Sequence, residues 1–409
     1  MRAPQSRRKR QRKPTNPYPS FPLTPHNNGQ WCKKIHGKVH FFGVWEDPDA
    51  ALQRYLQLAA DLHAGREPHQ SVSPDGPTVK EVCNRYLTYQ VQKLESQEIT
   101  ARSFEDYQTA AESFARFVGP TRSVNTLSPD DFQRYRQKLV RQGLPSKGRG
   151  LGVYALTRTI TIVRSIFKYA YEMDLVDKPV KFGKAFERPP VRLRRKARYH
   201  AEQANGKRLF EASDIRAMIE AADNPLRAMI LLGINGGFGN ADCGKLPIKA
   251  VDTNRAAIEF DRPKTGIERV VPLWPETLEA LRQSLVNRPT PVDKAAMNLV
   301  FVTTFGRPWL RENIHRTGDD DIAKIVPVDG IRQEFDKLLK KLGLKRKGIG
   351  FYALRHTFRT WADEVKDQHA VHRIMGHSIP GMSGIYIEEI SMDRLRAVTD
   401  HLRNKLFTQ

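Results

Sequence analysis

Three side chains near the carboxyl end of the chain could act together: a guanidinium, an imidazole and a phenol. Arg355 lies among apolar residues at helical spacing, so its side chain can leave the same side of a helix as that of Arg359. His377 follows a glycine that ends a second helical run, which places the imidazole at a helix terminus. Tyr386 comes nine residues later, beyond the helix-breaking stretch 378–381. The pattern indicates a tethered phenol nucleophile beside groups that can bind an anion.

This stretch reads Leu-Arg-His-Thr-Phe, then Met-Gly-His, then a tyrosine, and it resembles the tyrosine recombinase (phage integrase) family. The resemblance implies that the Tyr386 oxygen attacks a DNA phosphodiester, forming a 3′-phosphotyrosyl link and a free 5′ hydroxyl without metal or ATP. Arg355 and His377 would stabilise the charge that collects on the phosphate oxygens. Because the energy of the backbone bond is kept in the covalent link, no cofactor is needed for ligation.

The resemblance implies one further catalytic group, on a turn. Stretches 257–260 and 268–273 are predicted strands, and the turn between them contains Lys264. In the family, a lysine on such a hairpin protonates the departing 5′ oxygen, and Lys264 is at the matching position. A lysine beside a Thr-Gly turn is also common on any protein surface. Likewise Arg355 could be a structural ion-pair partner, and Tyr386 or His377 a core residue, but their joint spacing favours an active site.

Two positions depart from the family pattern. Residues 237–242 fit the family's G-[LF]-R-x-x-E motif, with Asp242 at the acidic position, but Gly239 stands where the motif has arginine. Tyr352 stands three residues before Arg355, where histidine or lysine is usual. Losing one oxyanion donor costs about 3–4 kcal/mol in a hydrolase, so two losses could slow the chemistry by orders of magnitude.

Both departures could be compensated at the phosphate. Gly239 could let backbone amides approach a phosphate directly, because no side chain intervenes. Tyr352 can still donate a hydrogen bond through its hydroxyl group. A substitute cation is the other solution, and the nearest candidates in the sequence are Lys245, Arg262 and Arg359.

Charge and composition point to a nucleic-acid partner. The 409 residues carry a formal net charge of +23, which favours binding to a polyanion such as double-stranded DNA. Three widely spaced cysteines indicate neither a disulfide framework nor a zinc site, and a metal site built from the histidines at 369, 372 and 377 lacks a carboxylate or cysteine at ligand spacing. We expect no metal and no cofactor. With no apolar run long enough for a bilayer and no signal core, we expect a cytoplasmic, nucleoid-associated protein.

The expected fold is multidomain and mainly α-helical. The chain divides into a basic disordered tail, a small sheet-and-helix module that could bind arm-type DNA sites, a four-helix core-binding (SAM-like) domain, a basic linker and a mixed α+β catalytic domain. Their boundaries are 1–20, 21–70, 76–188, 189–207 and 208–409. Turn, cap and periodicity signals predict the secondary structure. Helices are expected at 48–65, from a capping box at 78–81, at 104–118, 129–143, 156–173, 213–222, 225–235, 331–342 and 392–406, and strands at 31–35, 39–44 and 300–302.

Basic residues on the fourth helix and in the linker are the predicted DNA-binding residues, because they could contact phosphates of a clamped duplex. They are Arg158, Arg164, Lys168, Arg192, Arg194, Arg195, Lys196 and Arg198. An ordinary solvated helix face and a basic flexible loop are the alternatives.

The resemblance also sets the expected assembly and the competing functions. It implies a homotetramer on DNA, with the C-terminal helix exchanged between protomers, and accessory DNA-bending or directionality factors. Docking of that helix on its own domain is the alternative.

The leading hypothesis is a site-specific recombinase or integrase. A catalytically impaired architectural or regulatory DNA-binding protein, or a type IB topoisomerase that relaxes supercoils as a monomer, would share the fold.

Overall fold

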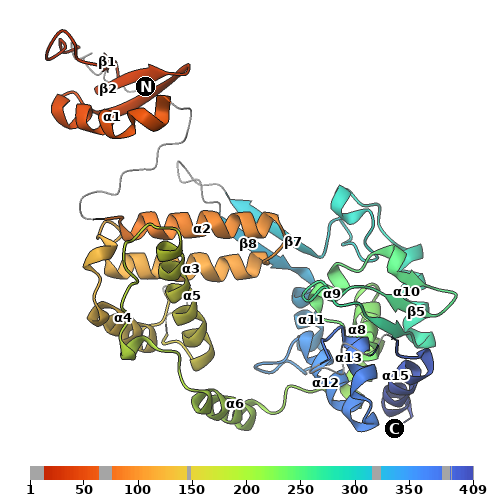
Figure 1. Ribbon diagram of the computed structural model, residues 1–409. Coiled ribbons are helices and arrows are strands. Elements are labelled where there is room, and N and C mark those ends of the chain that lie inside the picture. The colour runs from red at the N-terminus through yellow and green to blue at the C-terminus, as the bar shows by residue number, and fades with distance from the viewer. Residues whose placement is uncertain are drawn as a thin grey trace, which may run out of the picture. The chain divides into compact units, whose positions relative to one another are not determined.

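The computed structural model of the chain describes residues 13–63, 76–144, 149–315, 324–379, 387 and 389–408. It is mainly helical with three small antiparallel sheets in these ranges, which confirms the expected fold class in outline (Figure 1). Most of the predicted tail, residues 1–12, lies outside the described part, and so does Tyr386. No helix of the described residues is long and apolar enough to cross a membrane.

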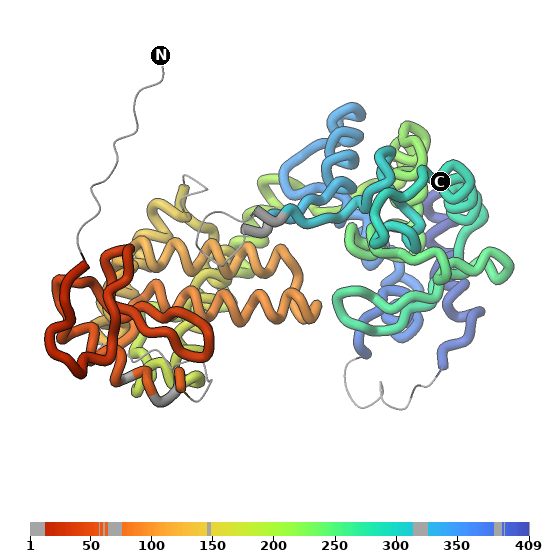
Figure 2. Tube along the Cα trace, turned by 90° about the horizontal axis from the view of Figure 1, so that it is seen from above, coloured from red at the N-terminus to blue at the C-terminus, as the bar shows by residue number. Residues whose placement is uncertain are grey.

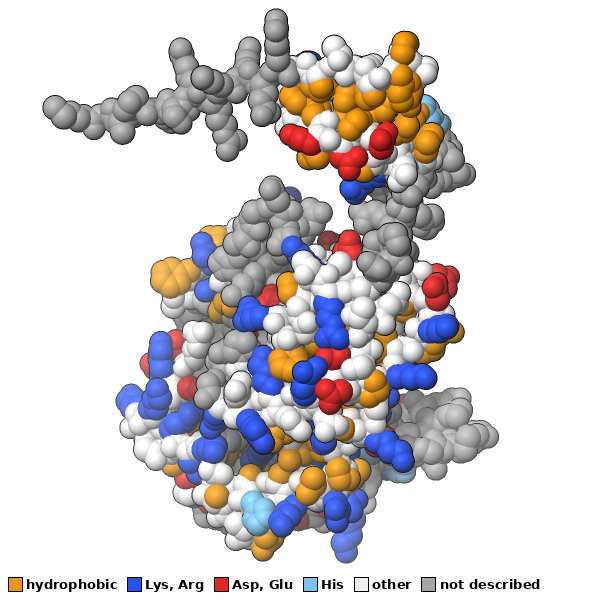
Figure 3. All heavy atoms as spheres, turned by 90° about the vertical axis from the view of Figure 1, so that its left-hand side faces the viewer, with side chains coloured by type: hydrophobic (Ala, Val, Ile, Leu, Met, Phe, Trp, Pro, Cys, Tyr) orange, Lys and Arg blue, Asp and Glu red, His pale blue; other side chains and the backbone are white. Residues whose placement is uncertain are grey.

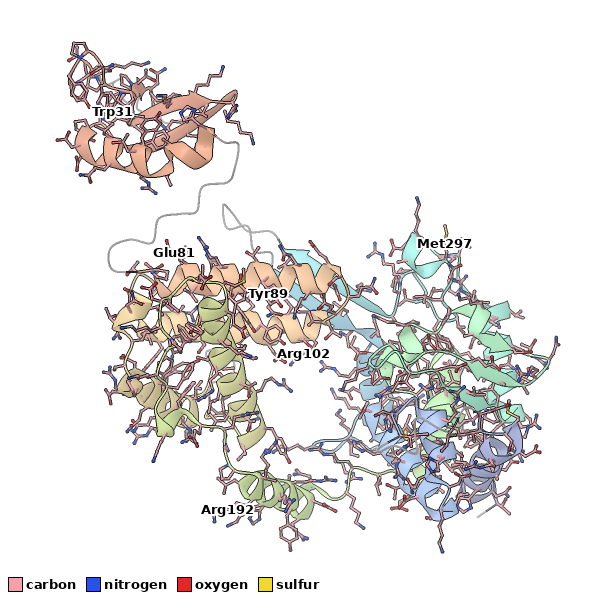
Figure 4. The ribbon with its side chains drawn as sticks, in the orientation of Figure 1. Trp31, Glu81, Tyr89, Arg102, Arg192 and Met297 are labelled. Atoms are coloured by element: carbon pink, nitrogen blue, oxygen red, sulfur yellow. The ribbon has the colours of Figure 1, made fainter. Side chains whose placement is uncertain are left out.

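The amino-terminal module is a three-stranded sheet covered by one helix. Strands β1 (Thr24–His26), β2 (Gln30–Ile35) and β3 (Lys38–Val44) pair in sequence order, and α1 (Pro48–His63) lies across them (Figure 1). The strands β2 and β3 and the helix α1 were predicted, whereas β1 was not. Trp31, labelled in Figure 4, is 1% exposed and packs edge-on against Phe21. Its burial holds the sheet and helix around one small core.

The next region contains the four predicted helices, α2 (Val79–Glu95), α3 (Ala101–Val118), α4 (Pro129–Arg141) and α5 (Val153–Glu172). The predicted capping box begins α2: Thr78 N donates to Glu81 at 2.8 Å, and Glu81 N donates to the Thr78 hydroxyl at 3.2 Å. Helices α2 and α3 run side by side (Figures 1 and 2), joined by an edge-on contact between Tyr86 and Tyr107.

The predicted basic linker, residues 189–207, is largely a helix. Helix α6 (Val191–Asn205) begins after Pro190 and ends at Gly206, whose φ is 76°. A proline before the first turn and a glycine after the last are ordinary helix boundaries, so the signal was present in the sequence. None of its residues is buried. Its stability must therefore come from helix propensity and exposed contacts, and its basic side chains remain at the surface.

The C-terminal domain begins with α7 (Ala212–Ala221) and α8 (Leu226–Asn235), followed by the five-residue α9 (Asn240–Gly244). Strands β4 (Val251–Asp252), β5 (Ala257–Glu259) and β6 (Val270–Pro272) form its sheet, and α10 (Pro275–Val286) and α11 (Gly330–Lys341) follow. Two helices come next, α12 (Tyr352–Ala362) and α13 (Gln368–Met375). The predicted strand at 300–302 is wrong, because that stretch forms only an isolated bridge. The hairpin of β7 (Leu310–His315) and β8 (Lys324–Asp329) was not predicted.

The last helix, α15 (Met392–Phe407), packs on its own domain. Leu395, Val398, Leu402 and Leu406 are buried in the domain core. The Trp274 indole donates to Thr399 O at 2.8 Å, which fixes the helix against the start of α10. This packing on its own domain is the alternative to the expected exchange of the helix between protomers, and it covers the apolar stripe of the helix within the chain.

Candidate active site in the C-terminal domain

Arg355 is the centre of the site, and α12 holds its guanidinium inside the domain. The side chain is 3% exposed. It donates to Gly237 O and to Met375 O, the latter at 3.0 Å, and its Nη2 lies 2.7 Å from His377 Nε2. Leu354 and Phe358 bury the same side of the helix. Arg359, one turn later, pairs with Asp363 at 2.8 Å.

His377 lies against Arg355, as the sequence predicted. Gly376 ends α13 with a φ of 61°, and the reversal brings the imidazole back towards α12. Because a guanidinium nitrogen only donates, Nε2 of His377 accepts in this contact and Nδ1 carries the proton. Burial and the charges of Arg355 and Arg262 lower the pKa of His377 to about 4. The imidazole is therefore neutral near pH 7 when no anion is bound.

A carboxylate and a second arginine support Arg355 from behind. Asp242 Oδ2 lies 3.6 Å from Arg355 Nη1 and 3.4 Å from Arg269 Nη1, and it accepts from Gly239 N at 2.7 Å. Arg269 is fully buried, donates to Gly236 O at 2.6 Å and Ile374 O at 3.1 Å, and lies 3.8 Å from the centroid of the Phe238 ring.

Burial lowers the pKa of Arg269 to about 10, so it remains charged at pH 7. Sequence reasoning missed this residue. Its signal was an arginine directly before the apolar stretch that forms β6.

The hairpin that carries Lys264 is tied to His377 through the backbone. The Thr265 hydroxyl donates to Gly376 O at 3.1 Å, so the β5–β6 turn lies beside the end of α13. Lys264 itself is exposed on this turn. The structure therefore brings the turn of Lys264 to the same place as Arg355 and His377. The position of the phenol of Tyr386 relative to them is outside the described residues.

The two departures from the family motif are also at this site. Gly239 precedes α9, and Tyr352 is the first residue of α12. An added Cβ at Gly239 would lie 3.3 Å from two ring carbons of Tyr352. Tyr352 is 49% exposed, so part of its ring faces solvent. Burial lowers the pKa of Arg355, whereas the interaction with the Tyr352 phenol acts to raise it.

The buried charges of this domain do not balance. Among the described side chains of residues 207–408, those that are both buried and charged are Arg262, Arg269, Arg355 and Asp242. The described buried side chains of this domain thus comprise three guanidinium groups and a single carboxylate. Burying an uncompensated charge costs several kcal/mol, which an incoming anion would offset. The arrangement is suited to bind an anion with several oxygens, such as a phosphodiester.

The predicted DNA-binding residues fall into two groups. On α5, Arg158 pairs with Asp106 at 2.8 Å, Lys168 with Glu172 at 3.3 Å, and Arg164 lies 4.5 Å from the centroid of the Phe182 ring. These three charges already have partners within the fold.

The second group is on α6 and comprises Arg192, Arg194, Arg195, Lys196 and Arg198. None of these five forms an ion pair with a described residue, and Arg192, labelled in Figure 4, lies on the exposed helix. In Figure 3, Lys and Arg side chains are spread over the surface in view, among apolar and acidic ones. Helix α6 is therefore the part of the predicted interface whose charges are available to phosphates.

Comparison with known proteins defines the class. Residues 207–391, which contain the whole cluster, match the model of the phage integrase family. They therefore form a domain of that family, the tyrosine recombinases. No curated protein matches the sequence.

Solved structures agree on the fold. A variant of the Tn1549 transposon integrase in complex with transposon right end DNA has 17% identity and a TM-score of 0.50, with 80% of this chain and 100% of that chain covered. A lambda integrase dimer bound to a COC′ core site has 15% identity and a TM-score of 0.51, covering 93% and 99%. A lambda integrase tetramer bound to a Holliday junction has 14% identity and a TM-score of 0.51, covering 92% and 99%. At these identities the likeness is one of fold.

Proposed function

We propose that this chain is a site-specific DNA recombinase that cleaves and rejoins duplex DNA through Tyr386. The observation that carries the proposal is the contact of Arg355 with His377 and Asp242, in a domain where, among the described residues, three buried guanidinium groups stand against one buried carboxylate. Such a cluster stabilises charge that develops on phosphate oxygens in a transition state. A net charge of +23 adds sequence-independent attraction to DNA.

In the proposed reaction, the Tyr386 oxygen forms a bond to phosphorus while the bond from phosphorus to the 5′ oxygen breaks. Lys264 gives a proton to the departing 5′ oxygen, which leaves as a hydroxyl group. Arg355 donates to the non-bridging oxygens, and the neutral His377 donates through a ring N–H. The covalent phosphotyrosyl link is then attacked by a 5′ hydroxyl, so the strand is rejoined without input of energy.

The proposed partner is double-stranded DNA, held in part by the free charges of α6. We propose that protomers assemble on it, since lambda integrase, which shares the fold, was solved as a tetramer on a Holliday junction.

The test uses duplexes that carry the inverted repeats flanking the gene, nicked next to the expected cleavage position so that the released segment diffuses away. The expected result is a covalent protein–DNA adduct with the wild-type chain and none with Tyr386→Phe. Tyr171→Phe, an exposed tyrosine on α5, should behave as wild type. Absence of an adduct from every repeat-bearing duplex would rule out the recombinase.

The competing function is an architectural or regulatory DNA-binding protein. The observation that favours it is Gly239, which offers no guanidinium where the family motif has one. In that case the chain would bind the same duplexes without forming an adduct. Binding measured by gel shift alongside the adduct assay therefore separates the two functions.

A further inference from the structure

Arg262 is a buried cation without an ion-pair partner among the described residues. It lies on the turn between β5 and β6 and is 7% exposed. Its Nε is buried without a hydrogen bond, and within the described part of the chain its guanidinium has no ion-pair partner. A guanidinium in this state carries a desolvation cost that a bound anion would offset. Because the Arg262 guanidinium forms no ion pair with the described residues, its charge is available to bind an anionic ligand.

The side chain of Arg262 runs along the turn that carries His377. An added Cβ at Gly376 would lie 2.8 Å from Arg262 Cβ and 3.2 Å from its Cδ. Arg262 O accepts from Gly266 N at 2.8 Å and from Thr265 N at 3.1 Å, which fixes where the side chain starts. Its charge is the cation that most lowers the pKa of Arg355. Arg262 therefore belongs to the Arg355–His377 cluster.

The other cations near the cluster are already engaged or exposed. Arg269 donates to two backbone carbonyls and covers the face of Phe238. Arg359 is paired with Asp363 and hydrogen-bonded to Gln368 at 2.6 Å. Lys245 is exposed at the end of α9. Of the three cations that the sequence suggested as substitutes, Arg262 is the one that is buried beside Arg355.

We propose that Arg262 binds the scissile phosphate together with Arg355 and supplies the guanidinium that the family motif places at position 239. This inference rests on the proposed recombinase function. Arg262 would donate to a non-bridging oxygen and neutralise part of the charge that develops on the phosphorane. The β5–β6 hairpin would then contribute two groups to the reaction, Arg262 at the phosphate and Lys264 at the leaving oxygen.

The first test measures anion binding without DNA. The full chain is titrated with inorganic phosphate while its thermal unfolding is followed, for wild type, Arg262→Met, Arg262→Lys and Arg255→Met. Phosphate should raise the unfolding temperature of wild type and of Arg255→Met, an exposed arginine near the same sheet. The rise should be partial in Arg262→Lys and lost in Arg262→Met. An equal response of wild type and Arg262→Met, including no response in either, would overturn the inference.

The second test measures cleavage on duplexes with either a phosphodiester or an uncharged methylphosphonate at the cleavage position. Arg262→Met should slow adduct formation on the phosphodiester by about 10²–10³-fold, as for the loss of one oxyanion donor. On the methylphosphonate the variant should approach the wild-type rate, because less charge remains to be neutralised. If Arg262 had a merely structural role, Arg262→Met would lower both rates equally. Either that result or an undiminished rate on the phosphodiester would contradict this inference without contradicting the proposed function. A wild-type chain that forms no adduct at all contradicts the proposed function as well.

Discussion

Gly239 and Tyr352 lie against each other: an added Cβ at position 239 would be 3.3 Å from both Cδ2 and Cε2 of the tyrosine ring. The backbone of Gly239 has φ −99° and ψ 178°, which any residue can adopt. Glycine is therefore not required there by the backbone, and the neighbouring ring is what limits a side chain. The two departures from the family motif, which are 113 positions apart in the sequence, are in contact in the structure.

This contact makes the effect of restoring the motif arginine depend on Tyr352. Gly239→Arg alone should lower the free energy of unfolding by about 1–3 kcal/mol, because the new side chain and the ring compete for one space. Combining it with Tyr352→His should recover part of that loss, giving a coupling energy of at least about 0.5 kcal/mol in a double-mutant cycle. Urea unfolding measures both quantities. Gly152→Arg is the control, since an added Cβ there meets nothing within 4 Å, and strictly additive effects of the two substitutions would contradict the coupling.

Arg269 should contribute more to stability than any exposed arginine of the domain. Arg269→Met removes the donors to Gly236 O and Ile374 O and leaves Asp242 with one fewer cation. The expected loss is about 3–5 kcal/mol, as for breaking a buried ion pair. Arg255→Met, which breaks a largely exposed pair with Glu259, should cost less than about 1 kcal/mol. Similar unfolding midpoints for the two variants would show that the buried network does not hold the domain together.

The sequence predicted the elements whose signals are local and left out those set by packing. The capping box at Thr78 and the glycine stop at Gly376 were correctly interpreted, because each is a short-range rule. Helix α6 was predicted only as a basic linker, although the proline and the glycine that bound the helix are visible in the sequence. The cis packing of α15 could not be decided from its apolar stripe, since the same stripe fits a neighbouring protomer equally well.

The candidate site shows the same division. Arg355 and His377 were placed together by motif spacing, and the structure gives a contact of 2.7 Å. The roles of Arg262 and Arg269 depend on which buried groups surround them. No periodic pattern in the sequence indicates which groups these are. The position of Tyr386 remains a prediction.

The neutral state of His377 should make stability depend on pH in a defined window. Its folded pKa is about 4, against an ordinary value of 6.5, so the unfolded chain takes up a proton between these values while the folded chain does not. This group's contribution is therefore fully present above pH 6.5 and decreases as the pH falls towards 4. In His377→Asn, which cannot titrate, the loss of stability between pH 7 and pH 5 should be smaller than in wild type. Urea unfolding at several pH values measures it, and parallel profiles for the two proteins would contradict a lowered pKa.

The packing of α15 predicts that the C-terminal domain is stable without a partner subunit. Leu402 is fully buried in the domain core, so Leu402→Ala should lower the free energy of unfolding by about 2–5 kcal/mol. Val286→Ala, at a side chain that is 83% exposed, is the matched control and should change it by less than about 0.5 kcal/mol. Because the helix packs within its own chain, the unfolding midpoint of wild type should not change with protein concentration in the absence of DNA. If the helix is exchanged between protomers, the midpoint should instead rise with protein concentration. The loss of unfolding free energy in Leu402→Ala should then become smaller at high concentration.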